Sequence, residues 1–159
     1  MARKQTFQLD ELDRKLLDLL QNDAARPLYE LGDLVGLSAS AVQRRLTRYR
    51  SSGVIDKQVA VLDPDVVAGT VLACVLVTLE RESKKLHGAF RQRLLAAPEV
   101  QQCYDLAGAW DYLAIVAASS MPRCRAVIDE LFLDAPNVKR YETLFICEPI
   151  KRGLNIPMR

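Results

Sequence analysis

The stretch that decides the N-terminal fold reads Gly36-Leu37-Ser38-Ala39-Ser40-Ala41-Val42-Gln43-Arg44-Arg45-Leu46-Thr47-Arg48-Tyr49-Arg50. Gly36 can take the positive φ that ends one helix, and Ser38 is a good N-cap for the next. In that next helix, apolar side chains recur at four- and three-residue steps and would face a core, at Val42, Leu46 and Tyr49. The stretch therefore predicts a short turn and the second helix of a helix-turn-helix motif.

Two amphipathic helices are expected before this stretch. The first has Asp10 as its N-cap, and Glu11 and Asp13 suit the positive end of the helix dipole. Apolar side chains at helical spacing mark both helices, with Leu9, Leu12, Leu16 and Leu20 in the first and Leu28, Leu31, Leu34 and Val35 in the second. The N-terminal part of the chain is therefore expected to form three helices around one core.

Two short β-prone runs follow the third helix. They are Val54-Ile55 and Val59-Ala60-Val61-Leu62, and the polar Asp56-Lys57-Gln58 lies between them. Such a pattern is typical of a hairpin, so we expect a wing that completes a winged helix-turn-helix domain over residues 1–62. Asp63-Pro64-Asp65 then breaks the pattern and opens a linker over residues 63–70.

The second half, residues 71–159, contains a repeat. Strand, helix and strand occur twice, and the copies share the similar phrases Ala97-Pro98-Glu99-Val100 and Ala135-Pro136-Asn137-Val138. Two β-α-β units in tandem predict a ferredoxin-like βαββαβ fold, in which both helices cover one face of a four-stranded antiparallel sheet. The chain is therefore expected to be α+β. Its strands are strongly apolar, so the uncovered face needs burial, and we expect at least a homodimer.

The charge of the chain is modest, but its distribution is uneven. Half of the 159 residues are hydrophobic (50%) and the formal net charge is +2, which excludes wholesale disorder. Between residues 43 and 57, however, five basic residues face Asp56 alone. A helix in the major groove reads base edges and holds phosphates with such residues. The candidate DNA-binding residues are Ser38, Ser40, Gln43, Arg44, Arg45, Thr47, Arg48, Arg50 and Lys57.

Within this set, two side chains have the geometry to read bases. Gln43 can make a bidentate pair with adenine, and Arg44 can do the same with guanine. Arg48, Arg50 and Lys57 suit phosphate contacts. The alternative interpretation is a charged helix face that only contacts solvent.

Several motifs along the chain match a known family. They are residues 9–17, Gly36-Leu37-Ser38 with Arg44-Arg45-Leu46, Ser52-Gly53-Val54-Ile55, Gly108-Ala109-Trp110-Asp111-Tyr112, residues 138–143, and Lys151 with Leu154 and Pro157. In order and spacing they resemble the Lrp/AsnC family (leucine-responsive regulator/asparagine regulator) over nearly the whole chain. The resemblance implies double-stranded DNA as a partner, an effector-binding and oligomerisation domain, dimers that assemble into tetramers or octamers, and an amino acid as effector.

The resemblance also implies an effector site. Residues 108–112 are similar to the family's Gly-x-x-Asp-Tyr motif, which lies near the effector pocket between dimers, and Thr143 matches a threonine near the same pocket. Gly108 would allow a tight turn, and Asp111 could accept hydrogen bonds from an α-ammonium group. The expected effector-binding residues are Gly108, Trp110, Asp111, Tyr112, Tyr141 and Thr143.

Two members of this effector set depart from the family. Trp110 and Tyr141 are bulkier than its usual residues, so they would shrink the pocket or select an apolar or aromatic ligand. The alternative is a plain hairpin turn that Asp111 caps, with Tyr112 in the core.

The sequence carries no motif for a metal, a cofactor or a membrane span, and we expect a cytoplasmic protein. The cysteines are widely spaced without a CxxC pair, which predicts buried, reduced thiols, at Cys74, Cys103, Cys124 and Cys147.

No catalytic residues are predicted. An enzyme similar to the tetrapyrrole decarboxylases of this fold would need pocket strands rich in histidine and arginine, whereas His87 is the only histidine and is expected on a helix surface. A further alternative is an architectural oligomer that binds DNA without a ligand, and it would show a steep salt dependence without sequence preference.

Overall fold

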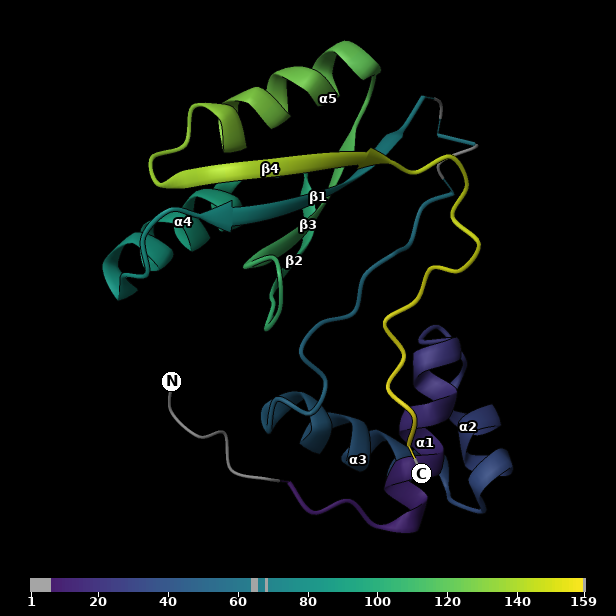
Figure 1. Cartoon of the computed structure of the whole chain (residues 1–159). Coiled ribbons are helices and arrows are strands. Elements are labelled where there is room, and N and C mark those ends of the chain that lie inside the picture. Colours follow the sequence, from purple (N-terminus) through teal and green to yellow (C-terminus); the bar gives the residue numbers. More distant parts are fainter. Residues whose placement is uncertain (1–6, 64–65, 68, 159) are drawn as a thin grey trace. The chain divides into compact units, whose positions relative to one another are not determined.

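The chain forms two compact units. The computed structural model describes residues 7–63, 66–67 and 69–158. Within these residues, one unit combines the chain up to Val61 with the tail from Lys151, and the other spans Leu62–Ile150 (Figure 1). The division differs from the expected one at the C-terminal end, because the tail belongs with the helix-turn-helix rather than with the sheet.

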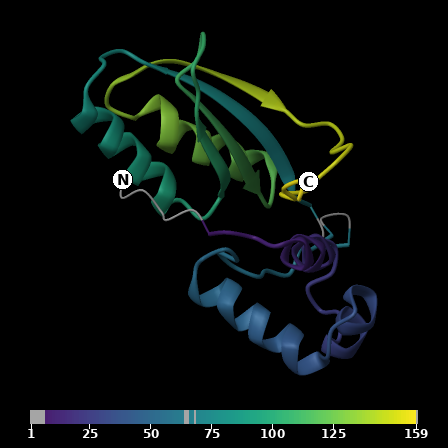
Figure 2. The same ribbon diagram turned by 90° about the horizontal axis from the view of Figure 1, so that it is seen from below.

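Three helices build the first unit. They are α1 (Glu11–Asn22), α2 (Leu28–Val35) and α3 (Ala39–Ser51). In Figure 2, where α1 is seen nearly end-on, α3 is seen along its length. A single hydrophobic core joins the three helices, formed by Leu16, Leu17, Leu20, Leu31, Val42, Leu46 and Tyr49. The expected helix-turn-helix is thereby confirmed.

Two glycines shape the turn between α2 and α3. Gly36 has a φ of 72°, the left-handed conformation that ends α2. Gly32 is buried inside α2, and the Leu37 N–H donates a hydrogen bond of 2.9 Å to its carbonyl oxygen. A Cβ added at Gly32 would overlap the Leu37 carbonyl oxygen, so the backbone of the turn can approach α2 closely only because this residue has no side chain.

Replacing Gly32 with alanine should destabilise the first unit by about 1–3 kcal/mol, because the backbone of the turn must move to admit the methyl group. Urea unfolding of the full chain measures the effect. Gly88→Ala is the matched control: Gly88 also lies in a helix, but an added Cβ meets nothing within 4 Å there. The control should gain about 0.5–1 kcal/mol from the better helix former. A Gly32→Ala protein as stable as wild type would contradict this account of the turn.

The predicted wing hairpin is not present. Residues 54–63, all of which the structure describes, contain no strand, and the apolar side chains of the second run are exposed, with 66% for Val59 and 83% for Val61. A two-residue hairpin turn favours residues such as Asn-Gly with positive φ, and Asp56-Lys57-Gln58 offers none. An isolated two-stranded ribbon is also marginal without a third strand or a face to cover.

The second unit has the predicted ferredoxin-like topology. Its elements follow in the order β1 (Val71–Leu79), α4 (Lys84–Ala96), β2 (Val100–Asp105), β3 (Tyr112–Ala118), α5 (Met121–Ile128), the short π-helix η1 (Asp129–Leu133) and β4 (Val138–Phe145). The strands lie in the order β2-β3-β1-β4, and every neighbouring pair is antiparallel. The expected α+β architecture is confirmed.

The two faces of this sheet differ. Alternate residues of β1 and β3 are buried against α4 and α5 in one hydrophobic core, as Val75 and Ala114 illustrate. The intervening residues are only partly buried, and Leu144 on β4 is 47% exposed. The open face is therefore apolar along β1 and β3, as the sequence predicts, with Leu72, Cys74, Leu76, Leu113, Ile115 and Leu144 on it, while the register places Gln102 of β2 and Arg140 and Glu142 of β4 on the same face.

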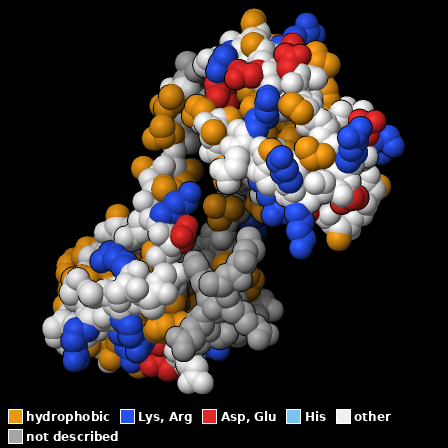
Figure 3. All heavy atoms as spheres, turned by 90° about the vertical axis from the view of Figure 1, so that its left-hand side faces the viewer, with side chains coloured by type: hydrophobic (Ala, Val, Ile, Leu, Met, Phe, Trp, Pro, Cys, Tyr) orange, Lys and Arg blue, Asp and Glu red, His pale blue; other side chains and the backbone are white. Residues whose placement is uncertain are grey.

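The face drawn in Figure 3 carries both basic and acidic side chains, in keeping with the modest net charge. Figure 3 shows lysine and arginine side chains on both units, with acidic side chains among them. Among the described residues, no helix is long and apolar enough to cross a membrane.

Candidate nucleic-acid interface and effector region

Helix α3 presents a polar face to solvent. Gln43, Arg44 and Thr47 are exposed, and the Gln43 side chain lies 3.5 Å from the Thr47 hydroxyl. Among the residues that the structure describes, none holds Arg44 in a hydrogen bond or ion pair, so its guanidinium group is available to a partner. The face therefore combines an amide, a hydroxyl and an uncommitted guanidinium group, which are the groups that read base edges.

The side chain at the start of α3 caps the helix. The Ser38 side chain accepts a hydrogen bond of 3.3 Å from the Ala41 N–H, and its hydroxyl lies 3.1 Å from that of Ser40. Ser38 is thus an N-cap, as predicted, while Ser40 remains exposed at the first turn. A phosphate near this end would meet the favourable end of the helix dipole.

A buried carboxylate joins α1 to α3, and the sequence analysis missed it. The Asp13 side chain is only 2% exposed. It accepts hydrogen bonds from the Tyr49 hydroxyl (2.5 Å), from Arg48 Nη2 (2.6 Å) and from Arg45. It also accepts one from the Asp10 N–H (3.1 Å), which closes a capping box. We call Asp13, Arg45, Arg48 and Tyr49 the Asp13 network.

The Asp13 network shifts the ionisation of its members. Burial alone would raise the pKa of Asp13, but the hydrogen bonds from Tyr49, the Asp10 N–H and Arg45 outweigh burial and hold the pKa below its ordinary value. The pKa of Tyr49 is raised by burial and by the adjacent carboxylate. The pKa of Arg45 is raised because Asp10 and Asp13 both accept its hydrogen bonds. The Asp13 carboxylate and the Arg45 guanidinium group therefore stay ionised at neutral pH, and the Tyr49 hydroxyl keeps its proton.

Two of the predicted DNA-binding arginines form ion pairs inside the helix-turn-helix. Arg45 pairs with Asp10 (2.9 Å) and with Asp13, and its side chain is only 22% exposed. Arg48 shares Asp13, although its side chain is 46% exposed. Arg45 therefore has a structural role between α1 and α3, and its contact with DNA stays a prediction. A signal for this was available, because residues 45, 48 and 49 share one side of a helix.

Two further basic side chains lie near the end of α3 and just after it. Arg50 donates a hydrogen bond of 3.1 Å to Gln58, and Lys57 is exposed. Both therefore remain on the surface, where phosphate contacts are made.

Asp111 joins the turn before β3 to the end of β1 by two hydrogen bonds. Its side chain accepts a hydrogen bond of 2.7 Å from the Leu79 N–H at the end of β1, and its own N–H donates to the Val77 carbonyl oxygen (2.9 Å). Asp111 therefore caps the strand end, as the alternative interpretation of this turn expected.

Gly108 does not behave as predicted. Its φ is not positive, and a Cβ added there would meet nothing within 4 Å. Nothing in the described chain requires glycine for a tight turn or a close approach at this position.

The aromatic members of the expected effector set lie in different places. Tyr112 is buried beneath α4, where its hydroxyl lies 2.7 Å from His87 Nδ1 and accepts from Arg91 Nε at 3.2 Å. Burial raises the pKa of Tyr112. His87 is therefore a half-buried partner of Tyr112 rather than a surface residue. Trp110, by contrast, carries the Arg140 guanidinium group 4.2 Å above its ring.

Tyr141 and Thr143 are on the helix-covered side of β4. The register pairs Thr143 with Val75 and Tyr141 with Val77, and both partners are buried against the helices. The Thr143 hydroxyl is buried and has no hydrogen-bond partner among the described residues. A shallow hollow lies beside Tyr141, lined by Phe132, Leu133, Val138, Lys139 and Arg140. The six expected residues thus do not close one pocket within a single chain.

The cysteines and acidic residues form no metal site in the part of the chain that is described. All four cysteines are free. Cys124 is buried and Cys74 is half-buried, as expected, but Cys103 and Cys147 are exposed. Those two do not act as core residues.

A helix-turn-helix with a basic, exposed second helix, followed by a ferredoxin-like unit, defines a DNA-binding transcriptional regulator with a separate ligand-binding domain. Comparisons with known proteins agree. The AsnC-type helix-turn-helix domain matches residues 9–50, and the Lrp/AsnC ligand binding domain matches residues 72–156. The chain belongs to the Lrp/AsnC family.

Relatives cover nearly the whole chain. An uncharacterized HTH-type transcriptional regulator of Haemophilus influenzae is 33% identical over 87% of this chain and 82% of its own length. The DNA-binding transcriptional activator DecR of Escherichia coli is 31% identical over 94% of this chain and 99% of its own. The crystal structure of the transcriptional regulator NMB0573 of Neisseria meningitidis in complex with L-Met has a TM-score of 0.85 at 28% identity, and the match covers 95% of this chain and 97% of that one.

Proposed function

We propose that this chain is a cytoplasmic, sequence-specific DNA-binding regulator whose assembly and promoter affinity respond to an amino acid. The observation that carries the proposal is the exposed face of α3, where Gln43, Arg44 and Thr47 are free to meet a major groove while the Asp13 network holds the opposite side. A rigidly held helix with an uncommitted arginine is suited to reading guanine.

Assembly is supported by the open face of the sheet. Its half-buried apolar side chains continue across β1 and β3 and reach Leu144 on β4. A continuous apolar face of this kind suits a second copy of the chain, which would also pair two recognition helices for two half-sites. We therefore propose a homodimer that assembles further into a tetramer or octamer.

An amino-acid effector is supported by two features of the second unit. The buried Thr143 hydroxyl lacks a partner, and the space around Gly108 is open. An unpaired buried hydroxyl is costly unless a ligand or water completes it. The complex of a Neisseria relative with L-Met makes amino acids the first class of ligand to test.

Thr143→Val separates binding from folding. Valine keeps the shape but removes the unpaired hydroxyl, so the free energy of unfolding should stay the same or rise by about 1 kcal/mol. If Thr143 contacts the effector, the thermal shift that the effector produces should disappear. In wild type, a ligand at about a hundred times its Kd stabilises the fold by roughly 2.7 kcal/mol, which a screen of the common amino acids detects.

The matched control is Thr78→Val. The Thr78 hydroxyl is also buried without a partner among the described residues, but Thr78 is not in the expected effector set. The control should keep the ligand-induced shift. A Thr143→Val protein that responds like wild type would remove Thr143 from the site, and a wild-type chain that responds to none of the amino acids would refute the effector class.

A further inference from the structure

The C-terminal tail is fastened to α1 although it has no regular structure. Four hydrogen bonds attach it there. The Gln21 side chain holds both backbone groups of Ile156, because its Nε2 donates to the Ile156 carbonyl oxygen (3.0 Å) and its Oε1 accepts from the Ile156 N–H (2.6 Å). The Asn155 side chain donates to the Gln21 carbonyl oxygen and to the Asn22 side chain, both at 3.3 Å. The attachment is therefore specific in geometry.

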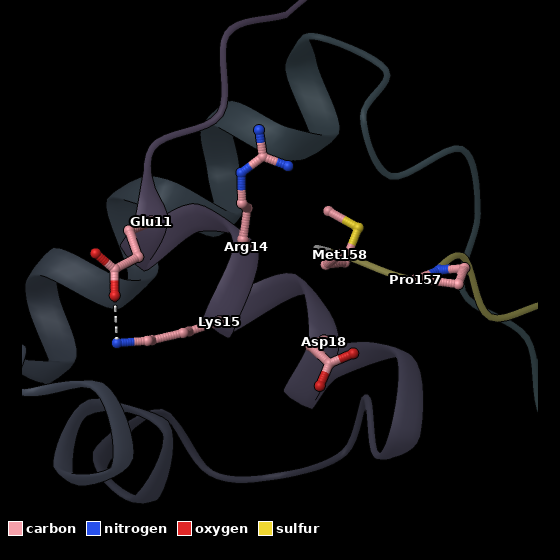
Figure 4. A pocket seen from close by; sticks show the side chains of 6 residues that line it. All are labelled: Glu11, Arg14, Lys15, Asp18, Pro157 and Met158. Atoms are coloured by element: carbon pink, nitrogen blue, oxygen red, sulfur yellow. Dashed lines mark ion pairs between the residues drawn. The ribbon is translucent and has the colours of Figure 1, made fainter.

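The end of the tail also joins the hydrophobic core of the first unit. Met158 is half-buried and packs against the leucine core of the three helices. Figure 4 shows Pro157 and Met158 beside the α1 residues Arg14 and Asp18, where they line a shallow pocket. The tail is thus held by an apolar contact as well as by hydrogen bonds. We call the two hydrogen bonds between the Gln21 side chain and the Ile156 backbone the Gln21 clasp.

The rest of the tail does not behave like a core element. Leu154 is 70% exposed and Ile156 is 68% exposed. An exposed segment that is held by a few hydrogen bonds and one methionine can detach without unfolding the helices, because such segments lie at the low-stability end of a structure.

The tail is a second connection between the two units of the chain. The tail follows β4, the strand that carries Tyr141 and Thr143, and it ends on α1, the helix whose Asp13 holds α3. The first unit is therefore tied to the second at two points of the chain, through residues after Val61 and through residues before Lys151. A unit that the chain joins at two points has less freedom to move than a unit joined at one point.

We infer that the tail from Lys151 is a strap that couples the effector state of the sheet unit to the helix-turn-helix, with the Gln21 clasp as its fastening point. The inference rests on the proposed function, since coupling requires an effector. An effector changes DNA affinity only through contacts that differ between two states. The clasp is such a contact: it is closed on α1 in this structure and is weak enough to open.

The test is the coupling factor, which is the ratio of the DNA Kd without and with an amino acid, measured by fluorescence anisotropy on the full chain. The amino acids are those of the common set that shift the melting temperature of wild type. In Gln21→Ala the coupling factor should fall at least fivefold toward one, while calorimetry on the DNA-free protein finds an unchanged ligand Kd. Gln21→Glu keeps the acceptor for the Ile156 N–H and loses the donor, so it should retain part of the coupling.

Controls separate the possible failures. Gln92→Ala removes an exposed glutamine from α4 and should leave the coupling factor unchanged. A chain that ends at Ile150 provides a second variant should Gln21→Ala fold poorly, and it should also lose the coupling. Full coupling in both variants would overturn the strap and leave the proposed function intact. A wild-type chain whose DNA affinity ignores every amino acid would overturn the proposed function, and the strap with it.

Discussion

Replacing Asp13 with alanine should destabilise the DNA-binding unit by about 3 kcal/mol. Removing one partner of a buried ion pair costs about 3–5 kcal/mol, and the low end applies because Arg48 keeps access to water. The buried Tyr49 hydroxyl also loses its acceptor. Urea unfolding of the full chain, followed by circular dichroism of the helices, measures the loss.

Two further variants sharpen this prediction. Glu11→Ala removes a carboxylate from the same helix, but among the described residues Glu11 pairs just with exposed Lys15 (2.8 Å), so its effect should stay below about 0.5 kcal/mol. Tyr49→Phe removes one hydrogen bond of the network and should cost about 1 kcal/mol. An Asp13→Ala protein no less stable than the Glu11→Ala protein would refute the network as the link between α1 and α3.

The Asp13 network also predicts how stability depends on pH. The pKa of Asp13 is lower in the folded state than its ordinary value of 3.8. A depressed pKa contributes stability that is complete above the unfolded value and is lost as the pH falls through the folded value. Below about pH 4, wild type should therefore lose stability more steeply than Asp13→Asn, which has no charge to lose. Parallel pH profiles for the two proteins would contradict this.

Replacing Arg44 with alanine should weaken binding to a specific duplex by about 1–3 kcal/mol, which is about five- to 150-fold in Kd, because a bidentate pair with guanine is lost. Arg44 is exposed and holds no other described residue, so the fold should be unaffected. Fluorescence anisotropy with a duplex enriched by the wild-type chain gives the Kd.

The control for Arg44 is a matched loss of charge. Arg125 is an exposed arginine of α5 in the other unit, so Arg125→Ala should leave the Kd nearly unchanged. Lys57→Ala should instead weaken binding about equally for all duplexes and reduce the salt slope by about one, as the loss of a phosphate contact does. Equal affinities for wild type and Arg44→Ala would remove Arg44 from the reading face.

The architecture of both units could be predicted from the sequence because periodicity reports burial. Val42, Leu46 and Tyr49 fall at helical spacing, and all three are in the core. The second unit has the repeated strand-helix-strand order that the sequence predicts, and its two central strands, β1 and β3, are runs of apolar residues. The prediction of a wing was wrong for a physical reason. β-prone residues form a stable hairpin only with a suitable turn and a surface to pack against, and residues 54–63 have neither.

The sites were harder to predict, because composition does not reveal partners in space. Arg45 and Arg44 are neighbours of the same type, yet Arg45 is bound to Asp10 and Asp13, while no residue in the described part of the chain holds Arg44. The clasp of Gln21 on Ile156 joins residues at opposite ends of the chain, which no local pattern signals. The expected effector residues are divided between the turn before β3, the core beneath α4 and the helix-covered side of β4, so no single stretch of sequence marks one site.

The central claim is that α3 reads sequence, and selection from a randomised duplex library by the full chain tests it most directly. We expect enrichment of one motif with two half-sites spaced by about one helical turn, or a multiple of it, and loss of that enrichment in Arg44→Ala. Binding that falls steeply with salt but enriches no motif would contradict the account and would leave an architectural DNA-binding protein in its place.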